Sequence, residues 1–351
     1  MSKSDLARRT ELTVKIDGVD VSADINKYFA QLTYTDFEED KTDDLQINID
    51  DRDGVWITDW LESGDGAKGA EISAAIVQKN FDSDGKTRVL DCGTFDIDAF
   101  DASGPPASVS IKATSLPYTS TIRTATNTKA WENISLSVIA KEIADRNGMA
   151  VMYESSFDPV FDRREQVQVS DIVFLHRLCH NAGISLKASG GIIVLFDAEK
   201  YEQNPAVREI KRGESDVKSY RFGTSTNDTK YARCHVSYTD PQTGRTIEYT
   251  YTPRDSDPDG QTLEINERVR TREEARNLAM RRLRQKNKDE YQAEFTLVGD
   301  VRLVAGVTVE VIGWGMFDGV YIIKTATHMV TGSGYTLMLD LRRVLEMEEE
   351  I

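Results

Sequence analysis

The 351-residue sequence contains only 3 cysteines, and these lie far apart at Cys92, Cys179 and Cys234. An odd number of widely spaced cysteines supplies neither a disulfide framework nor a Cys-x-x-Cys zinc motif. We therefore expect three reduced thiols in a protein that folds in a reducing cytoplasm.

Long hydrophobic runs are also missing from the sequence. No segment approaches the roughly 18 uncharged apolar residues that cross a bilayer as a helix. The first nine residues carry charges but no apolar core after them, which excludes the pattern of a secretory signal. We expect neither a membrane-spanning segment nor a signal peptide.

Basic residues are outnumbered, with 43 Lys and Arg against 59 Asp and Glu, and the formal net charge is −16. Phosphate binding depends on clustered Lys and Arg, so this balance argues against a protein whose main task is to bind nucleic acid. The hydrophobic content of 39% is high enough for packed cores and excludes a disordered chain.

Most of the chain alternates apolar and polar residues with a period of two, which predicts strands with one buried face. Before residue 127 the alternating apolar positions are Leu12, Val14 and Ile16; Leu45, Ile47 and Ile49; Ile72 to Val77; Phe95, Ile97 and Ala99; and Val109 with Ile111. Later strands are predicted at residues 149–153, 184–188, 192–196, 232–238, 247–251, 291–298, 307–313, 320–329 and 335–344. The run from 54 to 61 differs, and we interpret it as a helical turn or loop that plugs one end with Trp56 and Trp60.

Three segments have the 3.6-residue period of helices. The first follows Ser135 and ends at Gly148, and the second follows Ser170 and ends at Gly183. The third begins at Thr271, which forms a capping box with Glu274.

These elements predict a mainly β fold with an α+β insertion, in which two small β-barrels flank or enclose an α/β unit. We divide the chain into a first β-barrel region (1–126), the α/β insertion (127–212), a second β-barrel region with one helix (213–345) and an acidic tail (346–351). The sequence leaves open whether the first barrel borrows strands from the region after Ser215.

Two patterns suggest metal ligands, but neither supports a site. His176, Cys179 and His180 share one helical face, yet a structural zinc needs a fourth ligand that no nearby Cys or His supplies. Residues 80–85 with Asp91 partly match a calcium loop, but strands rather than helices flank them. A core-facing helix and a hairpin turn explain the two patterns better, so we predict no metal and no cofactor.

Paired carboxylates are the remaining route to catalysis. The candidate acids are Glu38, Glu39, Asp40, Asp43, Asp44, Asp50, Asp51, Asp53, Asp96 and Asp98. A glycosidase needs two acids about 5 to 9 Å apart across a cleft, whereas runs of acids usually form a hydrated surface. A peptidoglycan hydrolase that uses two of these acids is kept as the alternative function.

Other motifs have simpler explanations than catalysis or nucleic-acid binding. The segments 115–117, 189–191 and 313–319 have the composition of turns rather than of a nucleophile elbow or a phosphate-binding loop. Four tyrosines could stack on bases in an OB-type binder, but they are ordinary strand residues and the overall charge is too negative: Tyr231, Tyr238, Tyr249 and Tyr251. We assign no catalytic residue and expect no enzymatic activity.

Several segments, taken in serial order, resemble the late-control D family of tail hub proteins. The segments are 92–97, 104–106, 111–113, 139–148, 171–175, 183–186, 275–287, 295–300, 303–309, 315–321, 327–328, 334–336 and 341–343. This family belongs to phages with contractile tails and to related injection particles, and it is similar to the N-terminal hub part of type VI secretion spike proteins.

The resemblance implies a homotrimeric baseplate hub, located in the virion tail and assembled in the host cytoplasm. Its expected partners are the central spike, the tail tube or tube-initiator protein and other baseplate proteins. Two barrels in each of three chains would seat a sixfold tube above and a threefold spike below. DNA would pass through the axial channel without specific binding, and the acidic chain would repel it over roughly a Debye length of 8 to 10 Å.

Overall fold

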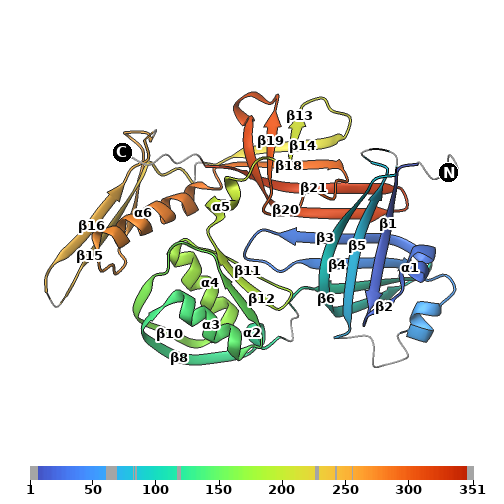
Figure 1. Ribbon diagram of the computed structural model, residues 1–351, viewed down its shortest axis with the longest axis horizontal. Helices are drawn as coiled ribbons and strands as arrows, with labels where there is room; N and C mark the ends of the chain where they lie inside the picture. The colour runs from blue at the N-terminus through green and yellow to red at the C-terminus, as the bar shows by residue number, and fades with distance from the viewer. Residues whose placement is uncertain are drawn as a thin grey trace.

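The computed structural model describes residues 7–345 apart from 61–68, 82, 84, 117–119, 226–228, 242 and 255. Figure 1 shows the amino-terminal strands in blue beside the carboxy-terminal strands in red, with the green α/β unit against them. The predicted acidic tail lies outside the described residues. Among the described residues, no helix has both the length and the apolar character needed to cross a membrane.

One 13-stranded sheet contains strands from both β regions of the chain. Its path runs β14-β18-β21-β20-β3-β4-β7-β6-β5-β1-β2, while β19 pairs with β20 and β13 pairs with β19. The strands are β1 (Arg9–Ile16), β2 (Val19–Asp20), β3 (Phe29–Phe37), β4 (Asp44–Asp50), β5 (Glu71–Lys79), β6 (Thr87–Ser103), β7 (Ser108–Thr114), β13 (Arg208–Lys211), β14 (Val217–Thr224), β18 (Tyr291–Val298), β19 (Thr308–Ile312), β20 (Gly319–Thr331) and β21 (Gly334–Arg343).

The mainly β fold predicted from the alternation is therefore confirmed, while the pairings among the described strands do not close into a barrel. The two regions are joined because β20 pairs with β3. The two β regions thus form one continuous sheet at this pair. The domain boundaries at 126, 212 and 345 stay predictions.

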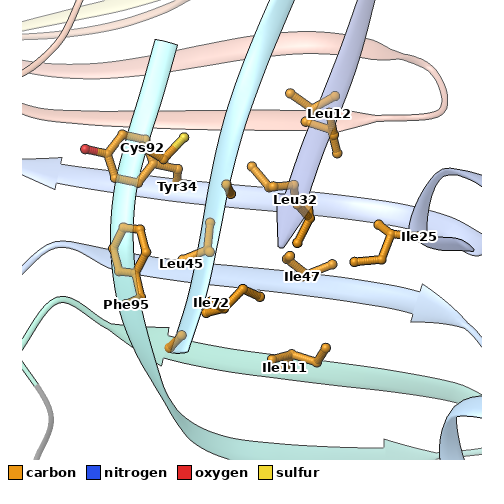
Figure 2. Packing of buried hydrophobic residues seen from close by; sticks show 14 of the residues in the cluster. Leu12, Ile25, Leu32, Tyr34, Leu45, Ile47, Ile72, Cys92, Phe95 and Ile111 are labelled. Atoms are coloured by element: carbon orange, nitrogen blue, oxygen red, sulfur yellow. The ribbon is translucent and has the colours of Figure 1, made fainter. Parts of the chain in front are cut away.

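The amino-terminal core forms where alternating strand residues face one another. Leu12, Leu32, Ile47 and Ile72 are buried there, and Figure 2 shows them gathered with Phe95 and their neighbours between the strands. The predicted helical turn is present as η2 (Trp56–Trp60), and Trp56 is buried as expected; the Trp60 side chain lies outside the description. The sequence analysis did not include α1 (Ser22–Tyr28) or β3, although β3 alternates the buried residues Leu32, Tyr34 and Asp36 with half-buried ones.

The α/β unit packs short helices between two small sheets. One sheet pairs β8 (Thr126–Ser135) with β10 (Val160–Ser170), and the other has the order β11 (Ser185–Ser189), β12 (Ile192–Phe196), β9 (Ala150–Tyr153). The helices are α2 (Thr121–Thr124), α3 (Leu136–Arg146), α4 (Asp171–Ala182) and α5 (Ala198–Glu202). Both predicted helix ends are confirmed, since Gly148 and Gly183 adopt positive φ. The alternation did not reveal β8 and β10.

A third body consists of a small sheet and the long helix α6 (Arg272–Asn287). Its strands are β15 (Arg233–Thr239), β16 (Thr246–Tyr251) and β17 (Thr262–Ile265). The predicted Thr271 cap is confirmed, because the Glu274 amide donates to Thr271 Oγ1 at 3.1 Å. The return bond differs from that of a standard capping box, since Glu274 Oε2 accepts from the Arg270 amide at 2.8 Å rather than from the Thr271 amide. The short helix η3 (Gly315–Phe317) lies in the predicted hairpin between β19 and β20.

Candidate functional site

The seam between β3 and β20 buries a histidine. His328 is fully buried, and its ring stacks on that of Tyr34 with the centroids 5.8 Å apart. Its Nδ1 lies 2.6 Å from the Tyr335 hydroxyl. Burial lowers the pKa of His328 to about 4, so the ring is neutral at neutral pH and the seam carries no buried positive charge there.

A second contact fixes the same two regions. Gln78 of β5 donates to the Gly299 carbonyl at 2.8 Å and accepts from the Val301 amide at 3.2 Å. Gly299 lies directly against the Tyr335 ring, since a Cβ atom at residue 299 would be 2.1 Å from Tyr335 Cγ. The segment after β18 therefore fits the amino-terminal sheet only with glycine at this position.

Four charged side chains form what we term the charged junction: Glu38, Glu202, Arg284 and Arg342. Arg342 Nη1 donates to Glu202 Oε1 at 2.6 Å, and its Nη2 donates to Glu38 Oε1 at 2.7 Å. Arg284 also binds Glu202. The exposed fraction of the Arg342 side chain is 0%, and those of Glu38 and Glu202 are 3% and 2%.

The charged junction joins distant parts of the chain. Glu38 follows β3, Glu202 ends α5, Arg284 lies on α6 and Arg342 lies on β21. In Figure 1, α5 and α6 lie between the outer β15–β16 hairpin and the large sheet. Burial raises the pKa of Glu38 against the opposing effect of Arg342, and burial lowers the pKa of Arg284. Buried charges of this kind are costly unless all partners stay in place.

Helix α6 contacts the rest of the molecule through further charged side chains. Arg281 donates to both carboxylate oxygens of Asp197, at 2.6 and 3.1 Å, and Lys288 binds Glu39. Burial opposes ionisation of Asp197, but hydrogen bonds from Arg281 and Ser155 lower its pKa. The opposite face of α6 packs its apolar residues on β15–β17. Charged contacts therefore set the position of this third body.

One of the candidate acids, Asp43, shares a lysine with Asp36. Lys187 Nζ lies 2.8 Å from Asp36 Oδ1 and 3.1 Å from Asp43 Oδ1. Asp36 Oδ2 also accepts from the Ala305 amide, and Asp43 Oδ2 accepts from Ser189 Oγ, both at 2.9 Å. Burial raises the pKa of Asp36 although Lys187 opposes it. Burial tends to lower the pKa of Lys187, but Asp36 and Asp43 together raise it.

The other candidate acids are dispersed over several elements rather than paired across a cleft. Asp40 lies 2.8 Å from His176 Nε2. Asp51 accepts from the first amides of η2, those of Trp56 and Ile57.

Five more of these acids lie in or beside strands. Asp50 pairs with Arg52, and Asp53 accepts from the Tyr28 hydroxyl. Burial raises the pKa of Asp44 and of Asp96. Asp98 is half-buried on β6. Most of these carboxylates thus have structural partners, which leaves the hydrolase alternative without a favouring observation.

The residues of the two motifs that suggested metal ligands make other contacts in the structure. Cys179 is buried, His180 Nδ1 lies 2.9 Å from Gln285 Nε2, and the rings of His176 and His180 are 6.3 Å apart. The Gly85 amide donates to Asn80 Oδ1 at 2.7 Å within the β5–β6 hairpin, which supports a turn. Asp82 and Asp84 lie outside the described residues. Within the described ranges, no three His, Cys, Asp or Glu side chains are arranged to hold a metal ion.

The sequence analysis missed Arg342, Arg284 and Glu202 as partners. Leu341 is buried, and alternation with a period of two predicts that the next residue, Arg342, lies on the polar face of β21. It becomes buried only because α5 and the end of β3 cover that face. No local signal marks such a residue in advance.

The comparisons with known proteins agree with this architecture. The model of the phage tail baseplate hub (GPD) family matches residues 97–334. The probable baseplate hub protein of Escherichia phage P2 is 27% identical over 185 residues, which are 52% of this chain and 44% of that protein. The match therefore spans less than half the length of this curated relative.

Solved structures share the fold over nearly the whole chain. The 43 kDa tail protein of prophage MuSo2 from Shewanella oneidensis has a TM-score of 0.65 at 16% identity, with 95% of this chain and 98% of that chain covered. The E. coli c3393 protein, a type VI secretion component, has a TM-score of 0.56 at 12% identity, with 96% of this chain and 79% of that chain covered. Because the family model matches more than half of the sequence, the resemblance to tail hubs is confirmed and this protein belongs to the phage tail baseplate hub family.

Proposed function

We propose that this chain is the structural hub that connects the central spike to the tail tube, as a homotrimer around an axial channel. Membership of the baseplate hub family is the observation that carries the proposal. In the proposed ring, the two β regions of each chain act as two similar barrel-like units. Three chains then present six such units to the tube and three equivalent faces to the spike.

A continuous sheet suits a structural component whose function depends on the relative positions of its binding surfaces. The β20–β3 pair joins the two regions by backbone hydrogen bonds, and the charged junction holds the α/β unit and α6 against them. A hub built in this way keeps its partner-binding surfaces at fixed distances from one another. Small errors in those distances would be repeated around a ring.

We infer that the hub acts without catalysis. The curated relative is named as a baseplate hub protein, and the carboxylates that the hydrolase alternative requires mostly have structural partners in this chain. A test is the clearing of purified peptidoglycan. Activity that is lost on changing a single Asp or Glu would contradict the inference.

The proposed setting is the virion baseplate or a phage-tail-like particle, after assembly in the host cytoplasm. Other baseplate proteins, the spike and the tube or its initiator are the proposed partners. The formal charge of −16 supports a channel wall that repels DNA and does not bind it specifically. Replacement of channel-facing acids by lysine should then slow DNA ejection.

Light scattering after size exclusion tests the hub directly. We expect a particle of three times the chain mass for the protein alone, or of three chains plus the bound spike after mixing with the spike from the same particle. The spike should co-elute with the trimer. A monomer in both samples would contradict the proposed ring.

A further inference from the structure

A groove of about 200 Å³ lies between the α/β unit and the amino-terminal half of α6. Its apolar lining includes Phe157, Phe161 and Leu178 from the α/β unit and Leu278 from α6. At its lining, Val160 remains 41% exposed although it is apolar. A dry cavity of about 150 Å³ accepts benzene, so this groove has room for one large apolar side chain.

Arginines surround this apolar surface. Arg268 Nε lies 2.5 Å from Asp162 Oδ2, and Arg270 binds the other oxygen of the same carboxylate. The Arg164 guanidinium carbon lies 4.4 Å from the centre of the Phe161 ring. Among the described residues, the only hydrogen bond of this guanidinium group runs from Nη1 to the Arg163 carbonyl. We refer to the groove with Phe161, Leu278, Arg164, Arg268 and Arg270 as the arginine groove.

The other acids that line the groove are engaged elsewhere. Glu267 lies 3.9 Å from Arg282, and Glu274 accepts from the Arg270 amide as part of the α6 cap. Asp162 therefore forms ion pairs with two guanidinium groups, while Arg164 has no carboxylate partner among the described residues. The rim of the groove therefore presents guanidinium donors to a ligand, although the chain as a whole has a formal charge of −16.

We propose that the arginine groove binds a short extended segment of another protein in which one apolar side chain is flanked by acidic ones. The apolar side chain would enter the groove and gain from the removal of its surface from water. The flanking carboxylates would accept hydrogen bonds from Arg164, Arg268 and Arg270, since guanidinium groups bind carboxylates in a bidentate way. The inference goes beyond the proposed hub function.

Fluorescence anisotropy with three labelled pentapeptides tests the inference on the full chain. The probes are Glu-Glu-Leu-Glu-Glu, the same peptide with Ser in place of Leu, and Lys-Lys-Leu-Lys-Lys, all at one fixed ionic strength because screening weakens exposed charge pairs. We expect the first peptide to bind at least ten times more tightly than either of the others. Equal affinities, or no binding of the first peptide, would overturn the proposal.

A double charge reversal, Arg164→Glu with Arg268→Glu, should weaken the acidic peptide at least tenfold and strengthen the basic one. Arg221→Glu is the matched control, because Arg221 is an exposed arginine on β14 with one acidic partner, Glu294, and it should leave the affinity unchanged. Circular dichroism confirms that both variants are folded. Self-association that disappears in the double variant would assign the groove to a second copy of the chain and overturn the proposed partner. Unchanged peptide affinity in the double variant would overturn the site itself.

Discussion

Arg342 and Glu38 are separated by 304 residues in the sequence, yet Arg342 Nη2 lies 2.7 Å from Glu38 Oε1 in the interior. Glu202 binds the other terminal nitrogen of the same guanidinium at 2.6 Å. The pair thus joins the first β region, the end of the α/β unit and the last strand through one side chain.

Loss of this guanidinium should strongly destabilise the protein. Arg342→Met leaves the buried Glu38 carboxylate without its ion-pair partner and leaves Glu202 with Arg284 alone, and we expect a loss of about 3 to 5 kcal/mol in the free energy of unfolding. Urea denaturation measures this loss. Arg221→Met is the control, because its side chain is 77% exposed, and it should cost less than about 1 kcal/mol. Equal midpoints for the two variants would contradict the role of the charged junction.

Replacement of Lys187 by Met should have a pH-dependent effect. Burial already raises the pKa of Asp36 against the effect of Lys187, so removal of this cation should raise it further above that of the unfolded chain. Protonation of Asp36 then stabilises the variant as the pH falls, so the loss of about 3 kcal/mol expected at pH 7 should shrink towards pH 5.

The matched change for Lys187 is Lys112→Met, which removes a lysine from an exposed pair with Asp101. We expect a loss below about 1 kcal/mol for this control at both pH values. Thermal melts at pH 7 and pH 5 compare the two variants. A loss in Lys187→Met that stays constant with pH would show that the carboxylates do not carry the effect.

His328 should make the seam sensitive to acid. Its pKa is lowered to about 4 in the folded chain, against about 6.5 in an unfolded one. The unfolded state therefore binds the proton more readily, and stability should fall as the pH drops from about 6.5 to about 4, by roughly 3 kcal/mol in total.

The variant His328→Asn isolates this contribution, because other titrating groups remain in both proteins. The difference in unfolding free energy between the two proteins should change with pH only across that window. Urea denaturation at several pH values from 7 to 4 provides the measurement. A difference that is independent of pH would exclude a buried neutral histidine.

Gly299 should be intolerant of any side chain. A Cβ atom there would lie 2.1 Å from Tyr335 Cγ, so Gly299→Ala has to displace the ring that contacts His328. We expect a loss of about 1 to 3 kcal/mol from overpacking, measured by thermal unfolding. Gly332→Ala is the control, since nothing lies within 4 Å of a Cβ atom at that position. Similar melting temperatures for the two variants would contradict the close fit.

Local sequence patterns predicted those strands and helices that have one clearly buried face. The alternation of Leu45, Ile47 and Ile49 placed β4, and the capping box of Thr271 and Glu274 placed the start of α6. Glycines at 148 and 183 ended the two helices of the α/β unit because only a residue that tolerates positive φ fits there. The family resemblance, which the comparisons confirmed, depended on the order of such segments.

Local patterns did not reveal β8, β10 or the charged junction. These strands have mixed exposure, with Trp131 and Gln166 buried and most of their neighbours exposed, so no period of two is visible. The sequence predicted a hydrated surface for the acidic run that contains Glu38 and Asp43, although the structure buries both side chains against cations.

The sequence by itself determined where most of the strands and the longer helices form and which family the chain belongs to, because those properties depend on neighbouring residues and their order. Only the tertiary structure decided that β3 pairs with β20 to make one sheet of two β regions. It also decided that Arg342 is buried against Glu38 and Glu202. Such pairings depend on which distant surfaces cover each other, and alternation within one strand carries no information about its partner.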